Sequence, residues 1–281
     1  MQAFPEFRGM PQSFWAMVKY ISEALGYTYR GQGRVRSYSL DEINAVVSEN
    51  GMCIDYDTVL ALKDYFDKRA ELLNDYVQFN LMDANEAREV FEKVYPLHRN
   101  NGFICKLPMN KQKGEMRQIA FFTAIINIIA ENEIRHSSIY DGTLGFNDDP
   151  RGLIYVLDNK NYIVGASSRR FDGAYPSIVN PKAVWEIKEY YYATTFGSRV
   201  ADGVYETQLD GYEFRDITNR SGKPIMHIFF VDAYKTWWVD GKSYLCRIID
   251  ILNSGLVDEV IVGREVLSRW PVLLREIIDE R

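Results

Sequence analysis

Two acidic residues and a lysine lie at a spacing that suits the hydrolysis of a phosphodiester. Glu186 and Lys188 are two residues apart within the apolar and aromatic segment 183–192. On a β-strand, residues two apart share a face, so both side chains would point the same way while Ile187 faces the core. A carboxylate and an ammonium group held beside a core need partners. A bound metal ion is one such partner.

A second carboxylate is expected close to Glu186. Asp172 follows the strand-like run 162–167, and a glycine and a proline just after it favour a turn before the next strand. A hairpin of this kind brings Asp172 beside Glu186. Mg²⁺ prefers oxygen ligands, usually one or two carboxylates completed by water and phosphate. We therefore expect a Mg²⁺ site at these two residues, with Lys188 acting on the attacking water or on the developing charge.

The pair Phe171-Asp172, followed by Glu186-Ile187-Lys188, resembles the motif of the PD-(D/E)XK nuclease superfamily, whose best-known members are type II restriction endonucleases. The proline of that motif is absent here. The resemblance implies that Asp172 and Glu186 bind the metal with the backbone carbonyl of Ile187. It assigns catalysis to Lys188 and implies cleavage that leaves a 5′ phosphate. The alternative is a solvated Glu/Lys pair on a strand edge and an aspartate in a turn.

The predicted elements around the motif follow the order that a nuclease core of this type implies. Strands are expected at 153–157, 162–167, 183–192, 225–231 and 257–262. Helices are expected at 198–212 and 242–252. The order is three strands, helix, strand, helix, strand. The expected fold is therefore α/β, with a restriction-endonuclease-like mixed sheet flanked by helices.

The first part of the chain is predicted to be helical. Apolar residues recur every three or four positions in four stretches, 12–25, 40–49, 56–80 and 84–95. Ser39 and Glu42 form the capping box that starts the second of them. We expect a helical N-terminal region at residues 1–105, a candidate for DNA recognition, and a nuclease core at residues 106–281. With 47% hydrophobic residues, the chain can bury a core as one compact unit.

Three further polar residues are candidates for roles near the metal. A helix expected at 115–134 precedes the strands, and in the nuclease superfamily the helix at this place often carries a carboxylate that reaches the metal through water. Glu131 and Glu133 are the candidates here, with a surface role as the alternative. Some members of the superfamily place a glutamine on the helix after the motif strand, which makes Gln208 an accessory candidate.

The formal net charge of −6 and the pI near 5.3 argue against indiscriminate binding to nucleic acid, because phosphate contacts need cations. Binding would depend on local basic groups. The candidates for DNA contacts are Arg30, Arg34 and Arg36, then Lys111, Lys113 and Arg117, and finally Arg169 and Arg170. A solvated basic loop is the alternative for each group.

The remaining composition narrows the class of protein. No stretch is apolar enough to span a bilayer, and the start of the chain lacks a signal-peptide core, so a cytoplasmic location is expected. The three cysteines are far apart and form no CxxC pair, which indicates neither a disulfide framework nor a zinc site. The three histidines are too scattered for a histidine-based nuclease.

Together these patterns predict a Mg²⁺-dependent endonuclease that hydrolyses DNA, most specifically a type II restriction enzyme. A homodimer on double-stranded palindromic DNA is expected, and a methyltransferase acting on the same site is a candidate partner. Trp237 and Trp238 would serve either the dimer interface or the core. The alternatives are a nuclease of repair, phage defence or RNA processing, and a DNA-binding protein of the same fold that has lost catalysis.

Overall fold

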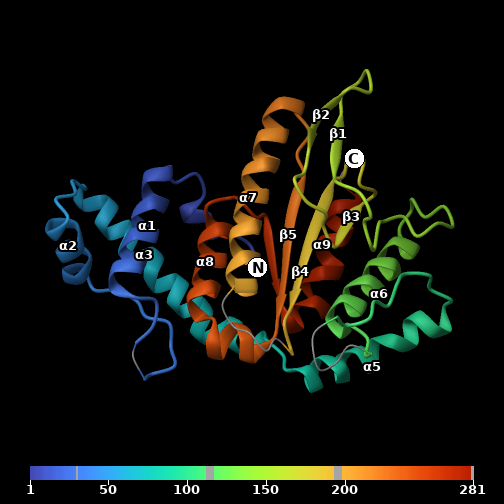
Figure 1. Cartoon of the computed structure of the whole chain (residues 1–281), viewed down its shortest axis with the longest axis horizontal. Coiled ribbons are helices and arrows are strands. Elements are labelled where there is room, and N and C mark those ends of the chain that lie inside the picture. Colours follow the sequence, from blue (N-terminus) through green and yellow to red (C-terminus); the bar gives the residue numbers. More distant parts are fainter. Residues whose placement is uncertain (30, 112–116, 193–197, 280–281) are drawn as a thin grey trace.

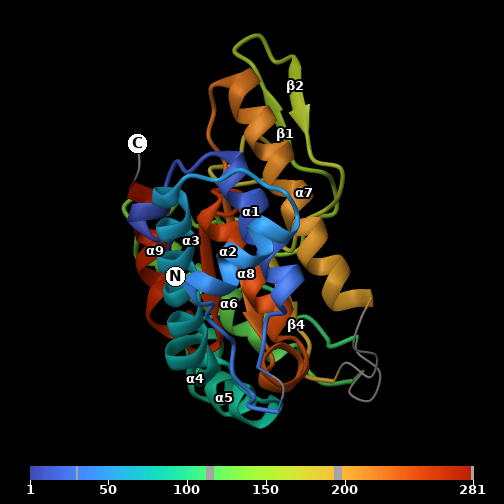
Figure 2. The same cartoon turned by 90° about the vertical axis from the view of Figure 1, so that its left-hand side faces the viewer.

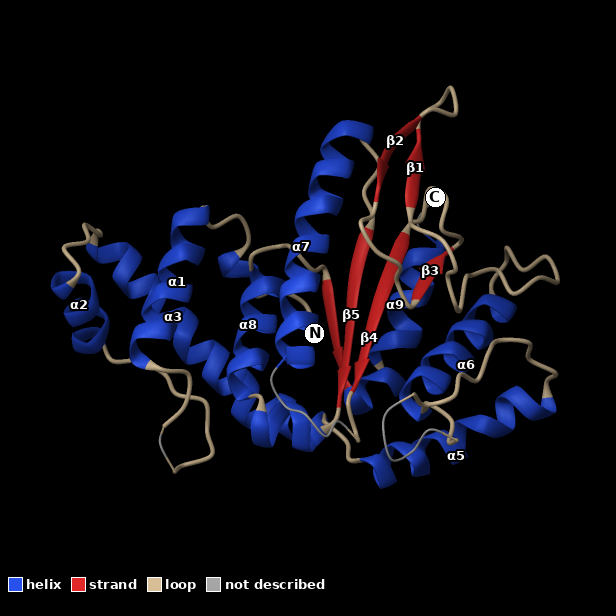
Figure 3. Ribbon diagram, in the orientation of Figure 1, coloured by secondary structure: helices blue, strands red, loops and turns tan. Residues whose placement is uncertain are grey.

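The computed structural model describes residues 1–29, 31–111, 117–192 and 198–279. At its centre is a four-stranded mixed sheet with helices around it (Figures 1 and 3). In order across the sheet, the strands are β3 (Gly173–Tyr175), β4 (Ala183–Glu189), β5 (Met226–Asp232) and β6 (Glu259–Val262). β3 is antiparallel to β4, whereas β4, β5 and β6 run parallel. A separate hairpin of β1 (Tyr155–Leu157) and β2 (Ile163–Ala166) projects from the body (Figure 2).

Different helices cover the two faces of the sheet. α6 (Phe121–His136) and α9 (Arg269–Asp279) share one apolar cluster with Trp185 of β4. α7 (Ser198–Ser221) and α8 (Lys242–Asn253) contribute to a second cluster with side chains of β5 and β6. Because both faces are covered, β4 and β5 are buried nearly along their length, as their apolar sequences require. The prediction of an α/β architecture with a mixed sheet is confirmed.

Helices fill the N-terminal part of the chain. They are α1 (Gln12–Leu25), α2 (Leu40–Glu49), α3 (Tyr56–Glu71), α4 (Gln78–Asn80) and α5 (Ala84–Asn100). A π-helical segment, Leu72–Val77, joins α3 to α4, and short helical turns occupy Pro5–Phe7, Lys235–Asp240 and Gly263–Leu267. The first two predicted ranges and the Ser39 capping box are confirmed. α5 packs on α6 in the cluster on one face of the sheet, which begins at Met82, whereas the cluster on the other face also includes Val35, Ala70 and Leu73.

Two predicted helix ends were wrong, each for a local reason. α5 continues past Pro96 to Asn100, and the carbonyls of Leu97 and His98 in its last turn accept from the N–H groups of Asn101 and Phe103. α7 continues through Gly211, where an added Cβ would lie 2.3 Å from the carbonyl oxygen of Leu256. The glycine therefore permits close packing of α7 and does not end it. The predicted start of α6 at residue 115 falls outside the described residues, and α9 was not predicted.

The predicted turn after Asp172 contains a strand. Gly173 opens β3, and an added Cβ there would lie 1.9 Å from the ring of Trp185 on β4. Gly173 lets the indole of Trp185 lie against β3. The absence of a side chain at this position therefore supports the pairing of β3 with β4. Trp237 and Trp238 are buried in the helical turn after β5 and pack in the core. No helix within the described ranges is both long and apolar enough to cross a membrane.

Arg69 joins the N-terminal helices to the sheet region. Its side chain on α3 is completely buried, and its Nη1 lies 3.0 Å from Oδ1 of Asp250 on α8. Its Nη2 donates to the Ser22 hydroxyl of α1 at 3.0 Å. The Tyr65 hydroxyl donates to the same Asp250 carboxylate at 2.6 Å. These contacts tie α1, α3 and α8 together through one buried ion pair.

We expect Asp250→Ala to lower the free energy of unfolding by about 3–5 kcal/mol, because it leaves a buried guanidinium without its partner. The double variant Arg69→Met/Asp250→Leu should lose much less, since both charges are gone. Urea unfolding of the single and double variants measures the difference. Equal losses from Asp250→Ala and from the double variant would contradict the pairing.

Candidate functional site

Asp172 and Glu186 face each other across the β3–β4 pair. Gly173 is paired with Trp185, and the Asp172 backbone N–H donates to the Trp185 carbonyl at 3.0 Å. Asp172 thus stands opposite Glu186, where cross-strand side chains share a face. The Ile187 N–H donates to Oδ2 of Asp172 at 2.7 Å. The predicted proximity of the two carboxylates is therefore confirmed.

The two carboxylates strongly affect each other. Asp172 is in part exposed to solvent, but many protein atoms lie around its carboxyl group, and Glu186 places a second negative charge beside it. This crowding, with the repulsion from Glu186 added, raises the pKa of Asp172 to about 7. The position therefore favours a bound cation when Asp172 is ionised.

Glu186 is itself covered by two cations. Only 5% of the residue is exposed. Nζ of Lys188 lies 2.5 Å from one carboxylate oxygen, and Nη1 of Arg169 lies 2.9 Å from the other. Burial disfavours the charged form of Lys188, but the contact with Glu186 outweighs it and raises the pKa of Lys188. Lys188 is therefore held protonated beside Glu186.

Arg169 connects Glu186 to a third carboxylate on α7. Its Nε lies 3.1 Å from both oxygens of Asp210, and its Nη2 lies 2.5 Å from Oδ2. Asp210 is only 3% exposed, and burial raises its pKa to about 6 although Arg169 opposes the shift. Arg169, predicted as a DNA contact, is thus placed inside the candidate site.

Sequence reasoning missed Asp210. The signal was the spacing of Glu206 and Asp210, which are four residues apart and so lie on one side of α7. Oε2 of Glu206 lies 3.5 Å from Nζ of Lys188. Gly203 lies on the same side, where an added Cβ would be 3.1 Å from the Lys188 side chain. This side of α7 is therefore shaped around Lys188 and Arg169.

The accessory candidates serve other contacts. Gln208 lines a cavity formed with α1 and α8, away from Glu186. Glu131 accepts hydrogen bonds from the backbone N–H groups of Ile104 and Cys105 and pairs with Arg135. Its carboxylate therefore fixes the loop before α6. Glu133 forms an ion pair with Arg275 of α9 at 2.6 Å.

The other lysines and arginines that were predicted to contact DNA divide into three groups. Arg36 pairs with Glu42 and donates to the Leu25 carbonyl, so it serves the N-terminal fold, and Arg34 pairs with Asp75 at 3.2 Å. Arg30 and Lys113 lie outside the described residues. The exposed members near or within the sheet region are Lys111, Arg117 and Arg170.

Two adjoining cavities meet at Asp172. The first, of about 670 Å³, is lined by Ile187, Glu189 and the loop before α6, and the second, of about 630 Å³, by Ser168, Arg169 and Arg170. Asp172 belongs to both. The Asp172 carboxylate is therefore accessible from two sides.

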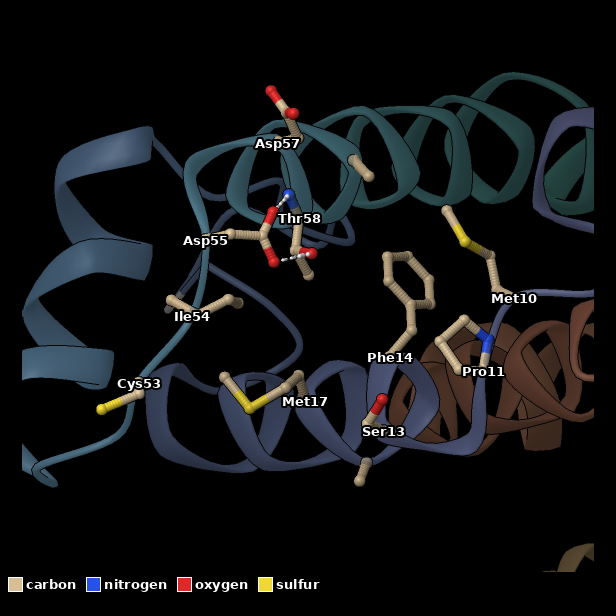
Figure 4. A pocket seen from close by; sticks show the side chains of 12 residues that line it. Met10, Pro11, Ser13, Phe14, Met17, Cys53, Ile54, Asp55, Asp57 and Thr58 are labelled. Atoms are coloured by element: carbon tan, nitrogen blue, oxygen red, sulfur yellow. Dashed lines mark hydrogen bonds between the residues drawn. The ribbon is translucent and has the colours of Figure 1, made fainter.

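A third cavity has a different character. It encloses about 740 Å³ between α1 and the start of α3 and is lined mainly by apolar side chains such as Phe14, Met17 and Ile54 (Figure 4). Asp55 lies in the lining of this cavity, and its carboxylate accepts hydrogen bonds from the N–H and the hydroxyl of Thr58. Asp55 thereby caps the start of α3. Asp55 and Thr58 therefore satisfy each other at the edge of this cavity (Figure 4).

The donor set at the site fits a hard cation. Asp172, Glu186 and the carbonyl of Ile187 offer oxygen atoms only, which Mg²⁺ prefers. The Ile187 N–H points at Asp172, and the carbonyl of a strand residue points to the same side as its N–H. Across the described parts of the chain, no group of three or more His, Cys, Asp or Glu is arranged to hold a metal. A metal would therefore depend on two carboxylates and would have to displace a cation from Glu186.

Comparisons with known proteins place the chain in a family. Residues 82–277 match a family described as a domain of unknown function (DUF7687). Residues 1–76 match a second family, also described as a domain of unknown function (DUF7690). No curated protein and no solved structure matches the chain. Since the first match spans more than half of its length, the chain belongs to the family of the DUF7687 domain.

Proposed function

We propose that this protein is a Mg²⁺-dependent endonuclease of the PD-(D/E)XK type that hydrolyses double-stranded DNA. The observation that carries the proposal is the opposition of Asp172 and Glu186 across β3 and β4, with Lys188 on the same face. The site borders two cavities, which gives a polynucleotide room on both sides.

Asp172, Glu186 and the Ile187 carbonyl would hold the metal. Bound Mg²⁺ supplies charge neutralisation at the phosphate and lowers the pKa of its water. The contact with Glu186 raises the pKa of Lys188, which favours its charged ammonium form. Its role is to stabilise the negative charge that develops on the phosphate.

Arg169 must release Glu186 before that oxygen can bind a metal, because its guanidinium pairs with one oxygen of the Glu186 carboxylate. When that oxygen turns to a metal, Asp210 retains the guanidinium through its remaining hydrogen bonds. The buried arginine thereby stays paired, which avoids an isolated charge in the interior.

The specific form we propose is a type II restriction enzyme in the cytoplasm. A homodimer would match the twofold symmetry of palindromic DNA, and a methyltransferase of the same specificity would protect the host. Digestion of long DNA with Mg²⁺ tests the proposal directly. Discrete bands support site-specific cleavage, a smear supports a nuclease without site specificity, and intact DNA contradicts the proposal.

Asp172→Asn and Glu186→Gln should each abolish cleavage, since each replaces a charged oxygen ligand by an amide of the same shape. Cleavage of a plasmid in Mg²⁺ measures the loss. Asp216→Asn, an exposed carboxylate on α7 paired with Arg220, is the matched control and should cut at the wild-type rate. Wild-type cleavage by either site variant would exclude the site.

Lys188→Met should reduce the cleavage rate by about 10²-fold or more, because its charge acts mainly in the transition state. DNA affinity measured in Ca²⁺ should stay within a few-fold of wild type. A variant that fails to cut because it no longer binds DNA would assign Lys188 to binding instead.

Changes at Asp210 and Arg169 should shift metal affinity in opposite directions. Asp210→Asn strengthens the hold of Arg169 on Glu186 and should weaken Ca²⁺ binding, whereas Arg169→Gln/Asp210→Asn frees Glu186 and should strengthen it. We expect each shift to be about tenfold, which corresponds to about 1.4 kcal/mol. Isothermal titration with Ca²⁺ measures both, and thermal unfolding checks that the variants fold. Shifts of the same sign would show that Arg169 does not compete with the metal.

A further inference from the structure

The second cavity beside Asp172 is lined by positive charge. Its lining includes four cationic side chains, Lys111, Arg151, Arg169 and Arg170. Among the residues that the structure describes, two acidic side chains, Asp149 and Asp172, share the lining. In a chain with a formal net charge of −6, this local excess of cations is unusual. It is the kind of surface that binds an anion.

The cationic side chains of this cavity differ in whether they already pair with carboxylates. Arg169 points to Glu186 and Asp210. Arg151 is 78% exposed and pairs only with Asp149, at 2.6 Å, within the described part of the chain. Arg170 is exposed, and its side chain has no hydrogen bond or ion pair among the described residues. Arg151 and Arg170 therefore retain donors for a ligand.

The backbone that carries these arginines is held in place. The Ser168 N–H donates to Oε2 of Glu213 on α7 at 3.0 Å, and the Ser168 hydroxyl donates to the same carboxylate. On the other side of the cavity, an added Cβ at Gly152 would lie 3.1 Å from the side chain of Ile178. The turn that follows Arg151 is thus packed closely on its neighbour. A ligand would meet donors on anchored segments, which lowers the entropic cost of binding.

We propose that this cavity is a phosphate subsite, formed mainly by Arg151 and Arg170, that holds a phosphate group of the substrate next to the one at Asp172. The proposal rests on the proposed nuclease function, because it places two phosphates of one strand in two adjoining cavities. Guanidinium groups suit the task, since their paired N–H donors match phosphate oxygens. The phosphate is either an internal diester or a terminal monoester, and both would use the same donors.

The test uses Arg151→Gln/Arg170→Gln in the full chain and measures binding of a fluorescent duplex in Ca²⁺ across salt concentrations. We expect affinity to fall by about tenfold, and the slope of log affinity against log salt to become shallower by about 0.9 for each phosphate that the variant no longer neutralises. The matched control is Arg88→Gln/Arg99→Gln, which removes two exposed arginines from α5. The control should bind like wild type. An equal loss in both double variants, or an unchanged slope, overturns the subsite.

The source of the phosphate is tested with the ends of the DNA. If closed circular DNA binds as well as linear DNA, the subsite holds an internal diester. If linear DNA with a terminal phosphate binds more tightly than DNA with a terminal hydroxyl, and the arginine variants lose this preference, it holds a terminal monoester.

Isothermal titration with inorganic pyrophosphate separates the two proposals. Pyrophosphate binding that disappears in Arg151→Gln/Arg170→Gln supports the subsite even if the wild-type protein cuts no DNA, in which case only the nuclease proposal fails. Cleavage by the wild type with no effect of the arginine variants on duplex or pyrophosphate binding leaves the nuclease proposal standing and refutes the subsite.

Discussion

Glu186 carries a negative charge where little of the residue reaches water, directly opposite the carboxylate of Asp172. A buried charge of this kind must be neutralised by nearby groups, and the surrounding architecture supplies them. Lys188 comes from the same strand and Arg169 from the loop before β3. Asp210 on α7 then balances Arg169. The site is thus one connected network of charges, built outward from a single glutamate.

The fold provides the positions that this network needs. β4 lies between β3 and β5, so the face with Glu186 and Lys188 is fixed by pairing on both sides. α7 lies over that face and approaches closely because two of its residues are glycines. Gly203 leaves space for the side chain of Lys188, and Gly211 allows contact with the backbone at Leu256. A larger residue at Gly211 would clash with the backbone of Leu256 and displace α7, which carries Asp210.

The N-terminal helices are connected to the same framework. Arg69 pairs with Asp250 of α8, and Arg247 of α8 donates to the Tyr205 hydroxyl of α7. α8 therefore contacts both the helical region and the helix that carries Asp210. The two family matches meet between residues 76 and 82, within a chain segment that contributes Leu81 and Met82 to the two clusters of the sheet region.

The local features of the fold could be predicted from the amino-acid sequence. Apolar periodicity located α1, α2 and most strands, the pair Ser39 and Glu42 started α2, and the two-residue spacing put Glu186 and Lys188 on one face. These follow from contacts between near neighbours in the chain. The sequence also predicted Asp172 beside Glu186, but through a hairpin of 162–167 with 183–192; instead β2 pairs with β1, and the unpredicted strand β3 holds Asp172 opposite Glu186.

Which distant charges meet depends on how the elements pack and could not be predicted from the sequence. Nothing near Arg169 in the sequence points to Asp210, and the basic run at 34–36 gives no sign that Asp75 and Glu42 would neutralise it. The same holds for Glu131, whose carboxylate is used by backbone amides of another segment. Charged side chains carry no periodic signal for their partners, since an ion pair depends on distance in space and not on separation along the chain. Spacing therefore reveals which groups share a face, whereas packing decides which of them remain available for a ligand.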